Sequence, residues 1–260
     1  MDKEGLKKEI ENMPTFSLRD IAVRENSYIR GSIVYRDIEN LKAIVRNDTG
    51  NVISVVSNKY RLVQFKDVFL PAIENIDKIQ NAYVLSYGGK GYVEIYPDGE
   101  EFVISDRERV GIALKNSVDK AWAIRISFVI SSKDFPTITL PSEVVKGLRK
   151  IHAGEIKITE DFLKVVNEAK ECWKKIVSDF QSYLLERDEL EEFAKKTKIG
   201  SKIRKKIEEI YEDHVPTLWE VFVKAIEEVS KRNFKSELSR KEKLERIAKA
   251  IFDYSIVLSI

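Results

Sequence analysis

Three basic residues of the stretch 109–130 are spaced so that they can share one face of a β-sheet, an arrangement that suits contacts with phosphate groups. The sequence RVGIALKNSVDKAWAIRISFVI places alternating large apolar side chains on both sides of a polar turn. A period of two puts neighbouring residues on opposite faces of a β-sheet. We therefore predict a β-hairpin with cations on one face and large apolar side chains on the other. The basic face carries Arg109, Lys115 and Arg125, and the apolar face carries Ile112, Ile124 and Phe128.

The basic face of this hairpin also carries very small residues, including Gly111, Ala113 and Ala123. Small side chains let another molecule or another element approach the backbone closely. One interpretation is that a nucleic-acid backbone lies there, because Arg and Lys are common partners of phosphate. The other is that a helix packs on the small residues, with the cations at its rim. The sequence leaves both interpretations open.

Tyrosines and further cations extend the set of candidates. Cations flank Tyr60 in NKYRLV, and Tyr83, Tyr87, Tyr92 and Tyr96 are spaced to share a face of a sheet. Aromatic side chains on one face usually pack across strands, and the alternative for Tyr60 or Tyr87 is stacking on bases. The candidate nucleic-acid-binding residues are Lys59, Tyr60, Arg61, Tyr87, Arg109, Lys115, Lys120, Arg125, Lys202, Lys205 and Lys206.

Two basic clusters lie in the second half of the chain. Residues 195–206 carry basic charges and no acid. A second set follows the segment TLWEVFVKAIEEV and consists of Lys231, Arg232, Lys235, Arg240, Lys241 and Lys243. A charge run is usually a helix face in water. Uninterrupted charge of one sign also suits a phosphate track.

Motifs of catalysis and metal binding are missing from the sequence. The chain has two histidines and lacks the GxxxxGK[ST], GxGxxG and HExxH patterns. Asp98 and the segment 155–157 faintly resemble a metal-dependent nuclease core, but Asp98-Gly99 is a turn signal. We therefore expect neither enzymatic activity nor a cofactor nor a bound metal.

Composition limits the class of protein and the cellular compartment that we expect. The chain has 260 residues, with 45 Lys and Arg against 43 Asp and Glu, so binding to nucleic acid has to come from local patches. Charged residues make up 34 %, and Lys and Glu dominate them, as on the surfaces of many thermophilic proteins. Cys172 is the single cysteine, and no apolar run approaches the roughly 20 residues of a membrane span. We expect a soluble cytoplasmic protein without membrane contacts.

Hydrophobic periodicity changes near Pro141. Short β-branched runs and Gly-rich turns precede it, and helical stripes follow. The fold class expected is α+β, with a mostly antiparallel sheet domain over residues 1–141, including one helix near residue 65, and a helical region over 142–260 packed on it. Trp173 and Trp219 lie in apolar helical stripes and are expected in the core.

The end of the chain shows strand-like alternation. In YSIVLSI, apolar Tyr254, Ile256, Leu258 and Ile260 alternate with Ser255, Val257 and Ser259. An apolar strand left in water invites aggregation. We therefore predict a C-terminal strand that docks on a sheet edge, either its own or that of a neighbouring subunit.

Four segments occur in an order that resembles a known family. They are VVSNKYRLVQFKDVF, KNSVDKAWAIRI, KIHAGEI and TLWEVFVKAI, between about residues 50 and 226. Together they are similar to landmarks of a large prokaryotic family of phage- and plasmid-encoded proteins, classed as a domain of unknown function. This chain departs from the family pattern at Lys120, Ala153 and Lys224, where glycine, threonine and asparagine are usual. The resemblance implies a mobile-element setting, and the fold is also analogous to single-strand annealing proteins of the RecT and Erf type.

The leading expectation is a single-stranded DNA-binding protein that contacts backbone phosphates. It would act as a homo-oligomer that anneals or protects strands. The alternative is a protein-interaction module, such as an anti-defence or plasmid-maintenance factor, that binds no nucleic acid.

Overall fold

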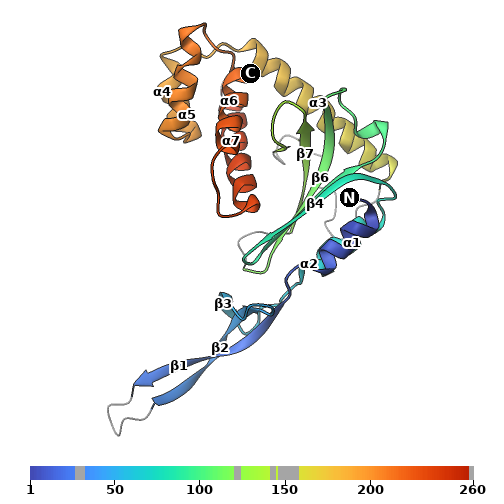
Figure 1. Ribbon diagram of the computed structural model, residues 1–260, viewed down its shortest axis with the longest axis vertical. Helices are drawn as coiled ribbons and strands as arrows, with labels where there is room; N and C mark the ends of the chain where they lie inside the picture. Colours follow the sequence, from blue (N-terminus) through green and yellow to red (C-terminus); the bar gives the residue numbers. More distant parts are fainter. Residues whose placement is uncertain (27–32, 120–123, 141–144, 146–157, 258–260) are drawn as a thin grey trace.

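The computed structural model describes residues 1–26, 33–119, 124–140, 145 and 158–257. Two antiparallel sheets precede a helical region, which confirms the α+β class (Figure 1). The first sheet has the order β1-β2-β3, and the second has the order β4-β5-β6-β7-β8. The strands are β1 (Phe16–Asn26), β2 (Ile33–Arg46), β3 (Val52–Ser57), β4 (Ile79–Tyr87), β5 (Lys90–Pro97), β6 (Glu108–Ser117), β7 (Arg125–Ser132) and β8 (Ile138–Thr139).

Helices flank the strands and make up most of the C-terminal region. No helix in the described ranges is both long enough and apolar enough to cross a membrane. The helices are α1 (Lys3–Glu11), α2 (Phe65–Glu74), α3 (Glu160–Ser182), α4 (Glu189–Thr197), α5 (Ser201–Glu208), α6 (Leu218–Ser230) and α7 (Glu237–Val257), with single 3-10 turns η1 (Glu100–Phe102) and η3 (Ile210–Glu212).

The three-stranded sheet, residues 16–57, extends away from the rest of the protein and is called the arm below (Figure 1). Its strand β3 lies at an edge of the sheet. Three large apolar side chains of the arm are exposed, Leu41, Val52 and Val55. The arm therefore presents both an apolar surface and free strand-edge groups to its surroundings.

One face of the five-stranded sheet belongs to the main hydrophobic core. Val110, Ile112, Leu114 and Phe128 are buried there, and α2 and α3 both contact β6. Ile112 pairs with Phe128, whereas Lys115 pairs with Arg125. Directly paired residues of antiparallel strands share a face, so the predicted hairpin register is confirmed.

The opposite, small-residue face of the same sheet is covered by α7. Leu238 of α7 packs with Tyr92, Tyr96, Ala113 and Val129 in a second buried cluster. Gly111 leaves room for the ring of Tyr96, which an added Cβ would approach to 2.6 Å. Of the two interpretations of this face, the packed helix is therefore the one observed over the described residues.

The helical core is organised by aromatic side chains. Thr159 caps α3 by accepting a hydrogen bond from the Phe162 N–H. Trp173 of α3 is completely buried, and its ring centroid lies 5.9 Å from that of Trp219. Trp219 packs on the core but stays partly exposed. The core prediction is thus confirmed for Trp173 and holds only in part for Trp219.

The strand predicted for the C-terminal tail is wrong for Tyr254–Val257. Helix α7 continues through these residues, and residues 258–260 lie outside the described ranges. Ile247, Ile251 and Tyr254 continue a helical stripe, and the Tyr254 ring packs edge-on against Phe193 at 5.1 Å. This tertiary contact overrides the local alternation of apolar residues.

We expect Trp173→Ala to destabilise the protein by about 3–5 kcal/mol, the usual cost of truncating a fully buried aromatic side chain. It also removes the hydrogen bond from Trp173 Nε1 to Glu108, which is 3.2 Å long. Trp219→Ala should cost less because Trp219 is partly exposed. Urea-induced unfolding measures both losses, and an equal or larger loss for Trp219 would contradict the packing described here.

Candidate nucleic-acid interface

Several predicted residues lie together where the arm joins the five-stranded sheet. The Tyr60 hydroxyl donates to the Val118 carbonyl at 3.1 Å, which ties the end of the arm to the β6–β7 turn. Burial and the nearby Asp119 carboxylate raise the pKa of Tyr60. Tyr87 pairs with Lys90 at the neighbouring β4–β5 turn. The exposed members of this group are Lys59, Arg61, Tyr87 and Arg125, and Lys120 lies outside the described residues.

The remaining predicted residues are either engaged inside the protein or lie far from this group. Arg109, at the opposite end of β6 from Lys115, donates to Gln80 Oε1 and, at 2.7 Å, to the Pro97 carbonyl. Lys115 is buried and forms an ion pair with Glu245 of α7. The α5 cations Lys202, Lys205 and Lys206 lie far from the arm (Figure 1). The predicted residues therefore do not form one continuous surface.

A second basic surface lies on α7 and the segment before it. An open hollow of about 600 Å³ is bordered by Phe234 and by the α7 side chains Lys243, Arg246 and Lys249. Burial lowers the pKa of Lys243, and the charges of Arg246 and Arg232 lower it further. We call this surface the basic hollow, defined by Arg232, Phe234, Lys243, Arg246 and Lys249.

One cation of the basic hollow, Lys249, pairs with Asp253 at 3.3 Å, whereas the other three are poorly neutralised. In the described part of the chain, no carboxylate forms an ion pair with Arg232, Lys243 or Arg246. Glu242 and Glu245 also border the hollow. Both are engaged with sheet lysines, Glu242 with Lys90 at 2.6 Å and Glu245 with Lys115. The hollow therefore keeps an excess of positive charge.

Sequence reasoning found part of this surface. The basic set after the segment TLWEVFVKAIEEV includes Arg232 and Lys243. Arg246 and Lys249 were missed because Glu242 and Glu245 separate them from the basic run and conceal the excess charge. The available signal was helical spacing, since Lys243, Arg246 and Lys249 lie on neighbouring turns of one helix.

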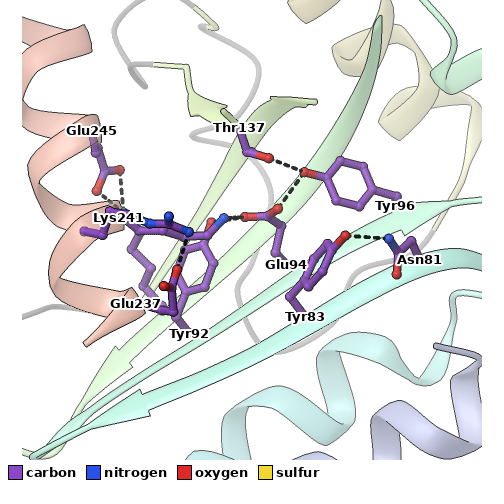
Figure 2. A network of polar contacts seen from close by, with 11 residues as sticks. Asn81, Tyr83, Tyr92, Glu94, Tyr96, Thr137, Glu237, Lys241 and Glu245 are labelled. Carbon is purple, nitrogen blue, oxygen red and sulfur yellow. Dashed lines mark hydrogen bonds and ion pairs between the residues drawn. The ribbon is translucent and has the colours of Figure 1, made fainter. Parts of the chain in front are cut away.

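A buried carboxylate fixes α7 against the sheet (Figure 2). Glu94, in the middle of β5, is only 1 % exposed. The hydroxyls of Tyr92 and Tyr96 each donate to this carboxylate at 2.6 Å, and Lys241 of α7 forms an ion pair with it. Because a buried charge requires such partners, this network determines where α7 lies on the sheet.

Both tyrosines of this network keep their protons. Burial, and then the negative charge of Glu94, raises the pKa of Tyr92 and that of Tyr96 well above the ordinary value. Two ammonium groups lie over the ring of Tyr92, with Lys115 Nζ 5.8 Å and Lys241 Nζ 5.1 Å from its centroid. Cation–π attraction adds to the two ion pairs.

Sequence reasoning did not single out Glu94. Its signal was available as an acidic residue inside the apolar run YVEIY, with a tyrosine two positions away on each side. That pattern places all three side chains on one face. The sequence contains no local sign that Lys241, 147 residues later, is the partner.

Comparison with known proteins found no matching family model, no similar curated protein and no similar solved structure. In the described ranges, no group of three or more His, Cys, Asp or Glu side chains could hold a metal ion.

We expect Lys241→Met to destabilise the protein strongly, because it leaves the Glu94 carboxylate buried without a countercharge. Breaking a buried ion pair costs about 3–5 kcal/mol, and the lower end applies because the Lys241 side chain is 23 % exposed. The double variant Glu94→Gln with Lys241→Met should recover much of the loss.

The matched control is Lys90→Met, which breaks the more exposed pair with Glu242. Urea-induced unfolding of the wild type, Glu94→Gln, Lys241→Met and the double variant gives the coupling between Glu94 and Lys241, and Lys90→Met is measured beside them. A loss for Lys241→Met no larger than that for Lys90→Met would show that the buried carboxylate does not hold α7.

Proposed function

We propose that the protein binds single-stranded DNA through backbone phosphates, and that the basic hollow is the main contact. The observation that carries this proposal is the group Arg232, Lys243 and Arg246, which lie close enough to lower the pKa of Lys243 and have no carboxylate partner in the described structure. A phosphate would supply the missing negative charge. Arg and Lys neutralise phosphates in this way in sequence-independent binding.

The basic hollow adjoins the cations at the end of the sheet. Glu245 borders the hollow and pairs with Lys115, and Lys115 pairs across the strands with Arg125. Arg125 is exposed. A strand that leaves the hollow past Glu245 would therefore meet Arg125 next.

Aromatic side chains favour a single strand over a duplex. Phe234 borders the hollow, and Tyr87 is 46 % exposed at the same end of the sheet as Arg125. Unpaired bases stack on such rings whatever their identity. The proposal has three finer parts: strand annealing, assembly into a homo-oligomer and a role in a mobile genetic element. They are suggested by the resemblance of four sequence segments to the phage and plasmid family.

The test is a fluorescence-anisotropy titration with a labelled single-stranded oligonucleotide at several salt concentrations. For single strands, each phosphate contact contributes about 0.7 to the slope of log affinity against log salt. The double variant Lys243→Gln with Arg246→Gln should weaken binding and reduce this slope by about 1.4.

The matched control is Lys202→Gln with Lys205→Gln, which removes the same charge from exposed positions of α5. This control should leave the affinity and the slope nearly unchanged. Equal effects of both double variants would mean that DNA affinity depends only on the net charge of the protein and not on the basic hollow. Absence of binding by the wild type at low salt would reject the function.

A protein-interaction module is the second candidate, and the arm favours it. Leu41, Val52 and Val55 are exposed beside the edge strand β3, where another chain could add a strand. We expect Val55→Glu to lower the mass of any assembly measured by light scattering, without lowering the melting temperature. An unchanged mass of the assembly would show that the exposed Val55 does not lie in its interface.

A further inference from the structure

A second hollow lies on the other side of α7 and is separate from the basic hollow. It is a pocket of about 430 Å³ between the first two turns of α7 and the face of the five-stranded sheet that α7 covers, with lining residues from β4, β5, β6 and β7. Sites for small molecules usually measure about 300–1,000 Å³. Tyr83, Glu94, Arg109, Glu237, Arg240 and Lys241 are among its lining residues, and all but the two arginines are labelled in Figure 2.

The charges in this pocket leave one cation unmatched. Glu94 is matched by Lys241, and Glu237 is matched by Arg240. Arg109 donates only to neutral oxygens, those of Gln80, Pro97 and Gly99, and no described carboxylate pairs with it. A partly buried guanidinium without a countercharge attracts an anion, and the excess corresponds to a single negative charge.

Two donor atoms in the pocket lining are also unused. The Nε atoms of Arg109 and Arg240 are buried and make no hydrogen bond within the described structure. A buried donor without a partner costs about 1–3 kcal/mol. Neither guanidinium is therefore fully satisfied by the protein, and a small shift of either side chain would direct a donor to a bound anion.

Part of the pocket lining is aromatic and apolar. Tyr83 is 47 % exposed, and Leu85 and Leu244 also line the pocket. The Tyr83 ring is held edge-on to Tyr96, with centroids 6.4 Å apart, and its hydroxyl accepts a 2.7 Å hydrogen bond from Asn81. A ring fixed in this way offers a flat surface for stacking.

We infer that this pocket binds a small organic anion that carries one acidic group and a planar ring. The acidic group, either a carboxylate or a phosphate monoester, lies at Arg109. The ring lies against Tyr83. This site is independent of DNA binding, because it uses residues on the opposite side of α7 from Lys243 and Arg246.

Isothermal titration calorimetry with four probes tests the inference. Adenosine 5′-monophosphate and 4-hydroxybenzoate carry the two kinds of acidic group, and adenosine and 4-hydroxybenzamide are their neutral counterparts. We expect at least one anion to bind at least tenfold more tightly than its neutral counterpart. The stronger anion identifies whether phosphate or carboxylate is preferred. Failure of both anions to bind at millimolar concentration would overturn the proposal.

Variants locate the bound anion. Arg109→Gln and Tyr83→Ala should each weaken binding of that anion about tenfold, and Tyr83 is exposed enough for its replacement to leave the fold intact. Arg107→Gln is the control, because Arg107 is exposed and pairs with Asp134 outside the pocket. If neither Arg109→Gln nor Tyr83→Ala weakened binding, the pocket would not be the site.

The variant Arg246→Gln separates this site from the DNA interface. Anion binding should survive Arg246→Gln, whereas DNA binding should be weakened. If the anion were lost in Arg246→Gln and kept in Arg109→Gln, it would lie in the basic hollow. That outcome would overturn this inference and leave the proposed DNA binding standing.

Discussion

The arrangement of the protein depends on the neutralisation of one buried carboxylate. Glu94 lies on a strand that is buried on both faces, and two of its hydrogen-bond donors, Tyr92 and Tyr96, come from the same strand. Their neutral hydroxyls satisfy the oxygens without cancelling the charge. The cation has to come from another element, and Lys241 of α7 supplies it. Apolar packing of Leu238 on the sheet is not directional, so the ion pair sets the position of the helix.

The position of α7 in turn creates two surfaces of different chemistry. Glu242 and Glu245 pair with the sheet lysines, and no carboxylate of the described residues pairs with the neighbouring cations Lys243 and Arg246. On the other side of the helix, the sheet face and α7 enclose a pocket in which Arg109 contacts, among the described residues, only neutral oxygens. In both places, the glutamate carboxylates form ion pairs within the protein, and the remaining positive charge is available to an anion.

The arm places a third kind of surface near the same end of the sheet. Its root is tied to the β6–β7 turn by Tyr60, close to the exposed Arg125 and Tyr87. Among its described side chains, Leu41, Val52 and Val55 are large, apolar and exposed, and its strand β3 lies at an edge of the sheet. The arm therefore adds exposed apolar side chains next to the basic end of the five-stranded sheet. A partner that spans both would need charge at one end and apolar surface at the other.

The sequence by itself determined the features that depend on local periodicity. Alternation in residues 109–130 placed Arg125 and Phe128 on opposite faces, helical stripes placed Trp173 in the core, and the change of period near Pro141 defined the α+β class. Tertiary structure decided what covers each face. The partners Glu94 and Lys241 are 147 residues apart, and Lys115 and Glu245 are 130 apart, so no local pattern connects them. The same long-range packing keeps Tyr254 helical against Phe193, although its neighbours alternate like a strand. Local spacing specifies which side of an element is apolar, whereas charge matching between distant elements specifies which surfaces remain open.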